Sequence, residues 1–320
     1  MIARKAPPGR SGLDLAEAGC TLLRSAPARD ILIYYAGSVP FVMGALLFIL
    51  RMSRDAFAAH DAGWAAARVA VLFTGMKCAH AVFSARLRAR VSGTADAPWR
   101  AGRILRMAAL QSAIQPFGFF VLPLALLAVV PFGWVHGFLN NVTVLGDGRE
   151  GAHAVLGKAW RQARLWPGQH HVLLWLSSPW LLGIGFFAAF LITAMAAYTS
   201  GLSDVAPTIG PWLTVALLMI IGFATLPVSP AGFLLAGNLS IMLVLVPMAL
   251  RAWTGIETVF AMHPMGMIFN TTFPLMVFGF CFLCMDPVMK AAYVIRCFDG
   301  DSISSGADLL GRLASVTESK

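Results

Sequence analysis

The chain has 320 residues, of which 58% are hydrophobic and 12% are charged, and its mean hydropathy is +0.74. A soluble domain carries roughly 25% charged residues, so this composition argues against a soluble protein and indicates one that lies in lipid. The formal net charge is +9, but the Lys and Arg residues stand beside apolar runs, which argues against a nucleic-acid-binding protein. The cysteines number five and have mostly apolar neighbours, which does not fit a secreted disulfide framework.

Residues 1–30 are expected to form a cytoplasmic segment. The stretch that follows Arg4 and Lys5 is too polar for a cleavable signal peptide, so we expect it to be retained. Ser11 is a favourable N-cap, and a weak apolar stripe after it predicts a short amphipathic helix. The members of that stripe are Leu13, Ala16, Cys20 and Leu23.

Long runs without Asp, Glu, Lys or Arg predict the membrane spans, because a spanning helix needs about 20 mostly apolar residues. The expected spans are 31–50, 63–85, 171–198, two joined by a turn within 205–250, and 267–285. The run 107–146 is too long for one span and contains three prolines, which predicts a Pro-broken hairpin or re-entrant segment. The runs are continuously apolar rather than alternating, so we expect an all-α fold. That fold is a polytopic transmembrane helix bundle of about 6 spans within residues 31–298.

Segment 151–166 predicts a basic amphipathic helix that lies in the plane of the membrane surface. Lys158, Arg161 and Arg164 share its polar face, as is typical of interfacial helices. Its apolar face consists of Ala152, Val155, Leu156, Ala159, Trp160, Ala163 and Trp166.

The distribution of cations predicts the orientation. Basic residues precede the first expected span and recur in 86–106, in 149–164 and from Lys290 onward, whereas 200–211 contains none. Because Lys and Arg are retained on the cytoplasmic side, we expect both termini, including a polar tail at 299–320, in the cytoplasm of a bacterium. The run 107–146 must then enter and leave the inner membrane on the same side.

Polar side chains inside the expected spans are functional candidates, because charge in lipid is costly. Lys77 and His80 lie one turn apart and could serve a transporter as a proton relay or anion site. The alternative is a snorkelling lysine beside a hydrogen-bonded histidine. Asp286 precedes Pro287 and stands four residues before Lys290, so the two can meet on one helix face as a structural lock. Lys77 is the alternative partner of Asp286.

Further polar residues suit structural contacts. Glu257 is expected to pair with Arg251. Asn141 is expected to form hydrogen bonds between helices, as are Asn140, Asn238 and Asn270.

Metal, cofactor and catalytic motifs are weak. Met262, His263, Met265 and Met267 form a candidate Cu(I) loop, since thioether and imidazole ligands suit Cu(I). Cys281, Cys284 and Cys297 lack a completing ligand set, so we interpret them as buried thiols rather than a zinc site. No nucleophile elbow, phosphate loop or metalloprotease motif occurs, and we expect neither a cofactor nor enzymatic activity.

Five blocks of the chain are distinctive: "LLRSAPARDILIYYAGSVPFVMGALLFILRMSRDAF", "MKCAHAVFSARLRA", "FGWVHGFLNNVTVLG", "ARLWPGQHH" and "DPVMKAAYVIRCFDGDSISSGADL". They resemble the successive blocks of a group of uncharacterised bacterial multi-pass inner-membrane proteins. The most specific is the C-terminal D-P-x-x-K-A-x-Y-x-x-R-C-F block. The basic surface helix is also distantly similar to the membrane domain of glycerophosphodiester phosphodiesterases. The resemblance implies a multi-pass architecture, an inner-membrane location and a MoxR-type ATPase system as partner.

These observations favour an integral membrane protein without catalytic activity, a subunit or scaffold of an inner-membrane complex, in contact with the lipid bilayer and other membrane subunits. The alternatives are a transporter or channel using Lys77, His80 and Asp286, and a Cu(I)-handling protein using the loop 262–267. A transporter should show a water-accessible cavity that reaches the buried charges. A scaffold should bury them paired and dry.

Overall fold

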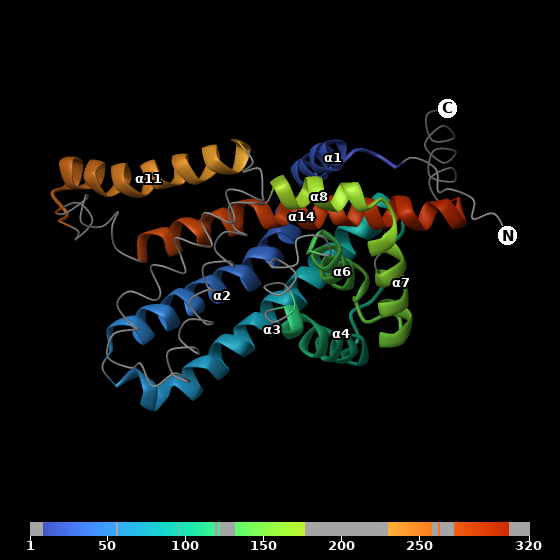
Figure 1. The fold of residues 1–320 in the computed structure, drawn as a ribbon, viewed down its shortest axis with the longest axis horizontal. Helices are drawn as coiled ribbons and strands as arrows, with labels where there is room; N and C mark the ends of the chain where they lie inside the picture. The colour runs from blue at the N-terminus through green and yellow to red at the C-terminus, as the bar shows by residue number, and fades with distance from the viewer. Residues whose placement is uncertain are drawn as a thin grey trace. The chain divides into compact units, whose positions relative to one another are not determined.

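The computed structural model describes residues 9–55, 57–95, 97–118, 121, 132–176, 230–257, 262 and 272–306. The regular structure over these residues is entirely helical (Figure 1). The chain divides into two compact units, one made of Met1–Leu174 with Asp286–Lys320 and the other of Trp175–Met285. Helix α14, Thr272–Ser305, contributes its first part to the second unit and its remainder to the first. The all-α prediction is confirmed for the described part of the chain.

Helix α1, Gly12–Arg24, begins at Ser11 as the sequence predicts. The Ser11 hydroxyl accepts from the Asp14 backbone N–H at 3.1 Å, and the Asp14 carboxylate accepts from the Ser11 N–H at 3.1 Å. This reciprocal capping box satisfies two N–H groups that the first turn leaves open. The buried side of the helix is centred on Leu15 and Gly19 rather than on Leu13, which is 57% exposed. A Cβ atom at Gly19 would lie 3.0 Å from the backbone N of Ala292, so glycine permits this close approach to α14.

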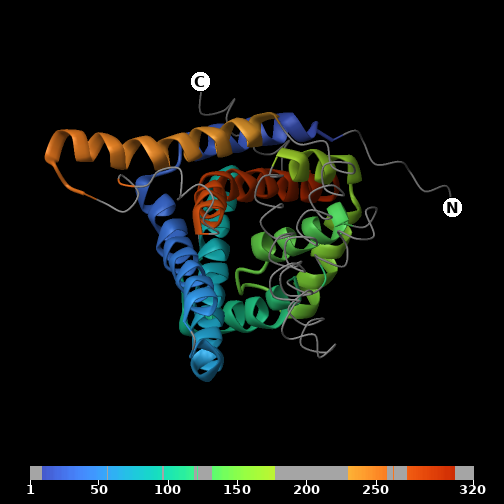
Figure 2. The same ribbon diagram turned by 60° about the vertical axis from the view of Figure 1, so that its left-hand side comes forward.

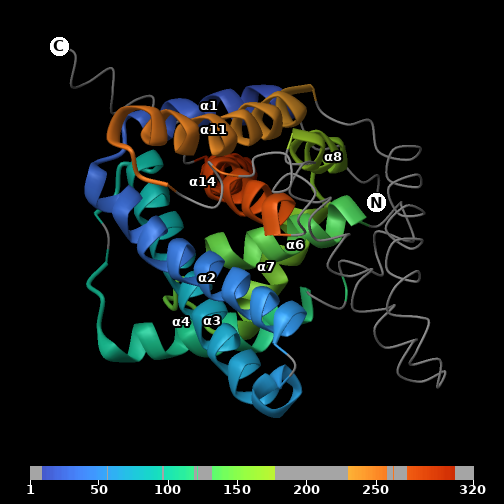
Figure 3. The same cartoon turned by 90° about the vertical axis from the view of Figure 1, so that its left-hand side faces the viewer.

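Helices α2, Ala28–Arg54, and α3, Ala58–Val91, form an antiparallel pair that packs side by side along most of its length (Figures 1 and 3). A Cβ atom at Gly37 would lie 2.5 Å from Ala79 Cβ, so glycine allows the two backbones to approach closely. Both helices extend beyond the spans 31–50 and 63–85, because arginine favours helix and does not end it. Charge marks the edge of an apolar run, not the end of a helix.

The next elements are α4, Ala101–Ile114, the 3-10 turn η1, Gln115–Phe117, which continues α4, and α6, Phe132–Leu145. Helices α4 and α6 lie on the same side of α3 (Figure 2). Gln111 donates to the carbonyls of Val142 and Gly146 at 3.3 Å, and Gln115 donates to that of Leu139 at 3.1 Å. The partner numbers fall as the glutamine numbers rise, so the two segments run antiparallel. This arrangement agrees with the hairpin expected for 107–146, whose residues 119–120 and 122–131 lie outside the described residues.

Helix α7, Ala152–Arg164, is followed by α8, Pro167–Leu176. Its apolar stripe is buried at Val155, Ala159 and Ala163, while Trp160 is 47% exposed. Val155 and Ala159 belong to a hydrophobic core shared with residues of α6 and α14. The stripe therefore packs largely against protein, and the position of α7 in the plane of the membrane surface stays a prediction.

The second unit contains α11, Pro230–Thr254, and the first part of α14. Phe273, Val277 and Cys281 form its buried cluster, against which Leu239 and Leu243 of α11 pack. Cys281 is thus a core thiol here, whereas Cys284 is exposed.

Four helices within the described residues are long and apolar enough to cross a membrane: Ala28–Arg54, His60–Val91, Leu234–Thr254 and Thr272–Ile303. They support an integral membrane protein. The expected count of about 6 spans is not confirmed, because 177–229 lies outside the described residues. Helix α14 also passes through Pro287 to Ser305, well beyond the end of the expected span 267–285.

Candidate functional site

The second part of α14 carries a row of buried polar side chains that we call the polar face of α14. Its members are Asp286, Lys290, Tyr293, Arg296 and Cys297, each at most 4% exposed. Their spacing of three and four residues places them along one side of the helix. This side points into the first unit, where each member contacts another helix.

Asp286 is the centre of the first group of contacts. The Tyr34 hydroxyl of α2 donates to its Oδ2 at 2.9 Å, and Lys290 Nζ lies 3.4 Å from its Oδ1. His80 of α3 places Nδ1 3.6 Å from Oδ2, and its ring stacks on that of Tyr34 with centroids 4.5 Å apart. The carboxylate therefore joins α2, α3 and α14, and the contact with Lys290 is the one its spacing predicts.

Ser38 contacts the other side of the His80 ring. Its hydroxyl donates to the Tyr34 carbonyl at 2.9 Å and lies 2.8 Å from His80 Nε2. His80 therefore contacts Ser38 through Nε2 and turns Nδ1 toward the Asp286 carboxylate.

Lys290 extends the network to α6. Its Nζ donates to Asn140 Oδ1 at 2.6 Å, and Asn140 Nδ2 lies 3.2 Å from His136 Nε2. Both Asn140 and His136 are buried. A buried ammonium needs both opposite charge and hydrogen-bond acceptors, and here Asp286 supplies the charge while Asn140 supplies an acceptor.

Tyr293 links α14 to α8 through His170. The His170 Nε2 lies 3.0 Å from the Ala163 carbonyl, which can only accept, so Nε2 carries the hydrogen. Nδ1 then accepts from the Tyr293 hydroxyl at 3.0 Å. Burial first, and then the Arg296 guanidinium, lower the pKa of His170 to about 3. The imidazole is therefore neutral at physiological pH, as its hydrogen bonds require.

Arg296 and Cys297 hold the C-terminal end of α7. The Arg296 guanidinium donates to the Gln162 carbonyl at 2.7 Å and to the Leu165 carbonyl. A cation at this position satisfies open carbonyls and opposes the negative end of the helix dipole. The Cys297 thiol donates to Asn141 Oδ1 at 3.4 Å, and Asn141 Nδ2 donates to the Ala159 carbonyl of α7 at 3.2 Å. Asn141 thus forms the interhelical contact expected of it.

Among the other predicted site residues, Lys77 lies close enough to Asp286 and Lys290 to interact with their charges. The Lys77 Nζ lies 5.3 Å from the centroid of the Phe73 ring, so the structure gives it a cation–π contact on its own helix. Glu257 lies 3.3 Å from Arg251, as expected, on the exposed surface of the second unit. Asn238 donates to the carbonyl of Leu234 in its own helix rather than between helices.

The candidate copper loop falls almost wholly outside the described residues. Met262 is 45% exposed, and His263, Met265 and Met267 are not described, so Cu(I) binding stays a prediction. Among the described residues, no group of three or more His, Cys, Asp and Glu could hold a metal ion.

Two buried aspartates were not recognised from the sequence. Asp147 lies within 3.0 Å of Arg88 and Arg149 and 3.3 Å of Arg103. Asp30 lies 2.8 Å from Arg86. From the sequence, these arginines are interpreted only as indicators of membrane topology. Acidic residues are scarce near them, so the few that occur, Asp30 and Asp147, could have been recognised as their ion-pair partners.

Comparison of the chain with protein-family models, with curated proteins and with solved structures gives no match.

Proposed function

We propose that the chain is an integral membrane protein without catalytic activity that serves as a subunit or scaffold of a bacterial inner-membrane complex. The observation that carries this proposal is the polar face of α14, which uses its charged and polar groups for contacts within its own unit. Asp286 binds Tyr34 and Lys290, and Arg296 binds carbonyls at the end of α7. Such groups act as connectors between helices.

Burial supports a connecting role over a transport role. A transport site needs access to water, whereas Asp286 is 4% exposed and Lys290 is 2% exposed. The cavity lined by Arg86 and Arg90, and a second lined by Arg106 and Leu156, include no residue of the polar face of α14. Asp286 and Lys290 are buried and paired with each other, which supports a scaffold over a transporter.

The proposed topology has both termini in the cytoplasm and about 6 spans. Arg86, Arg88 and Arg90 lie at the end of the α2 and α3 pair that also carries α1. Since arginines are retained on the cytoplasmic side, that end is assigned to the cytoplasm, and the connection between α2 and α3 is assigned to the opposite side.

Purification from native membranes tests the scaffold role. The tagged chain is isolated in mild detergent, and co-purifying proteins are quantified by mass spectrometry against an unrelated multi-pass protein carrying the same tag. We expect a specific membrane partner in an amount comparable to the chain, and the resemblance of the C-terminal block makes a MoxR-type ATPase system the first candidate. Recovery of the same background proteins with both baits would contradict the proposal.

A proton-coupled transporter or channel is the second candidate, favoured by the geometry at His80. Its Nδ1 faces the Asp286 carboxylate at 3.6 Å, and a line of hydrogen-bonding groups continues through Lys290 and Asn140 to His136. The imidazole, carboxylate and amine groups of this line can exchange protons, and the Asn140 amide joins it through hydrogen bonds only. Transport predicts that Asp286→Asn gives a folded protein without activity. The scaffold role predicts loss of the fold.

A further inference from the structure

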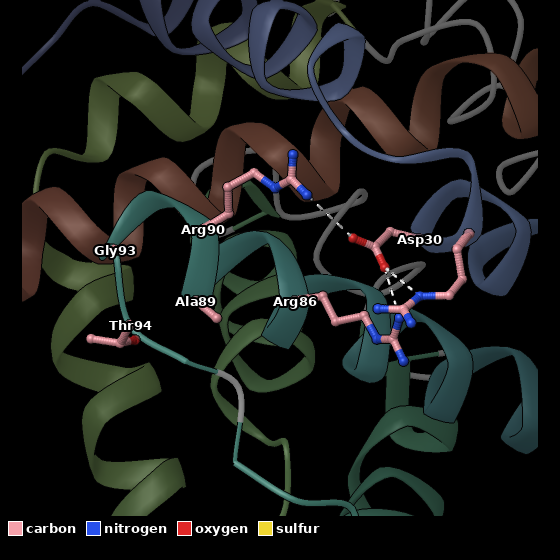
Figure 4. Close-up of a pocket in the computed structure, with 7 residues that line it drawn as sticks. Asp30, Arg86, Ala89, Arg90, Gly93 and Thr94 are labelled. Carbon is pink, nitrogen blue, oxygen red and sulfur yellow. Dashed lines mark hydrogen bonds and ion pairs between the residues drawn. The ribbon is translucent and has the colours of Figure 1, made fainter.

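A cavity of about 410 Å³ opens at the end of the α2 and α3 pair, within the first unit. The first turn of α2 and the last turns of α3 form its walls. Its lining residues are Arg29, Asp30, Arg86, Ala89, Arg90, Gly93 and Thr94. We call it the arginine pocket, and Figure 4 shows Arg86 and Arg90 of α3 reaching toward Asp30.

Charge in the arginine pocket is unbalanced. Three guanidinium groups surround one carboxylate, which leaves a formal charge of 3 − 1 = +2. Arg86 lies 2.8 Å from Asp30, while Arg90 and Arg29 each lie 3.9 Å from it. Asp30 therefore neutralises part of the cluster, and an excess of positive charge remains for an anion.

Exposure places the carboxylate at the back of the pocket and the guanidinium groups toward the opening. The Asp30 side chain is 5% exposed, whereas those of Arg90 and Arg29 are 38% and 78% exposed. Arg90 is also held in place by a hydrogen bond that its Nη1 donates to the Ser25 carbonyl at 2.7 Å, while its Nη2 faces Asp30. An incoming anion therefore meets cations first, and part of that cation array is already held in position.

The backbone adds to the same field. Arg29 and Asp30 lie in the first turn of α2, where the helix N–H groups carry partial positive charge and Pro27 precedes the helix without a side-chain cap. Phosphate groups bind at helix N-termini next to arginine because the two donors act together. The N-terminus of α2 thus adds partial positive charge to that of the arginines in the pocket.

We propose that the arginine pocket binds a phosphate-bearing anion, and that its position selects the headgroup of an acidic phospholipid. The walls are the ends of two helices that are long and apolar enough to cross a membrane, so the pocket lies where headgroups lie. Basic pockets between transmembrane helices on the cytoplasmic side bind acidic headgroups. The lipid assignment rests on the proposed orientation, whereas the phosphate chemistry does not.

Lipid titration tests this proposal with a matched pair of variants. Native mass spectrometry of the detergent-solubilised full chain would measure binding of phosphatidylglycerol, with phosphatidylcholine as the zwitterionic reference. The test variant is Arg29→Gln/Arg90→Gln, which keeps the buried Asp30 and Arg86 pair. The control is Arg51→Gln/Arg54→Gln, which removes the same charge from the opposite end of α2.

The wild-type chain should prefer phosphatidylglycerol, and the test variant should lose about fivefold in affinity for each arginine, or about 25-fold in all. The control should bind as the wild type does. Equal losses in both variants, or none in either, would overturn the pocket as the site. Inorganic phosphate that displaces the lipid at equal concentration, with the same dependence on Arg29 and Arg90, would overturn the lipid as ligand. A thermal unfolding curve of each variant verifies that it is folded.

Discussion

At the scale of single residues, the environment of His170 determines its charge. Its Nε2 donates to the Ala163 carbonyl and its Nδ1 accepts from the Tyr293 hydroxyl. Only a neutral ring can make both hydrogen bonds at once. A buried histidine with a pKa of about 3 binds a proton far less readily than one in the unfolded chain, whose pKa is about 6.5. The unfolded state therefore takes up more protons between these two pH values.

Stability should consequently fall as the pH falls below about 6.5. At about pH 5 the contribution of His170 to the loss is at most roughly 2 kcal/mol, since one pKa unit corresponds to about 1.4 kcal/mol. We expect the midpoint of thermal unfolding in detergent to drop between about pH 7 and about pH 5, and to drop less in His170→Gln. Parallel curves for the two proteins would show that His170 titrates alike in both states.

Local spacing predicted part of the site, and three-dimensional packing determined the rest. Asp286 and Lys290 lie on the same helix, so their contact follows from a separation of four residues. Tyr34 lies 252 residues from Asp286 in the chain, and Asn140 lies 150 from Lys290. Nothing in either local sequence specifies such a partner.

At the scale of the helices, the connection between α6 and α7 depends on one glycine. Gly148 has a φ of +79°, and a Cβ atom there would collide with the backbone oxygen of Arg103. The tight turn lets Asp147 receive Arg88 and Arg103. Glycine is favoured here both because its φ is positive and because the neighbouring backbone leaves no room for a side chain.

Gly148→Ala should therefore destabilise the protein by about 1–3 kcal/mol, because strain at a positive φ adds to the collision. Gly157→Ala is the matched control, since Gly157 lies inside α7 and a Cβ atom there would have no neighbour within 4 Å. That change should stabilise the helix by up to about 1 kcal/mol. Thermal unfolding of both variants checks the opposite signs, and similar destabilisation by both would refute the explanation.

Helix type was easier to predict than helix length. Continuous apolar runs predicted α2, α3, α11 and the first part of α14, because length and hydropathy alone set whether a helix can span lipid. The runs end at charged residues, but α14 continues because its later polar side chains face protein rather than lipid. The length of a run without charged residues therefore underestimates the length of such a helix.

At the scale of the whole molecule, the arginines predict which ends of the spans face the cytoplasm. In a variant without native cysteines, Ser53→Cys near the turn between α2 and α3 should react with a membrane-impermeant thiol reagent applied to intact spheroplasts. Arg161→Cys in α7 should react only after the membrane is permeabilised. Both sites are exposed, so a difference reports the side of the membrane. If the reagent labelled Arg161→Cys but not Ser53→Cys in intact spheroplasts, the orientation would be the reverse of the one proposed.

The most direct test of the polar face of α14 as a connector compares Asp286→Asn with Asp286→Asn/Lys290→Met by thermal unfolding in detergent. Removing one member of a buried ion pair leaves the other charge uncompensated and costs about 3–5 kcal/mol. The single variant should therefore lose much of its stability, and the double variant should recover part of it because the Lys290 ammonium is no longer buried without its partner. A single variant as stable as the wild type would contradict the structural role of Asp286 and favour a carrier of protons.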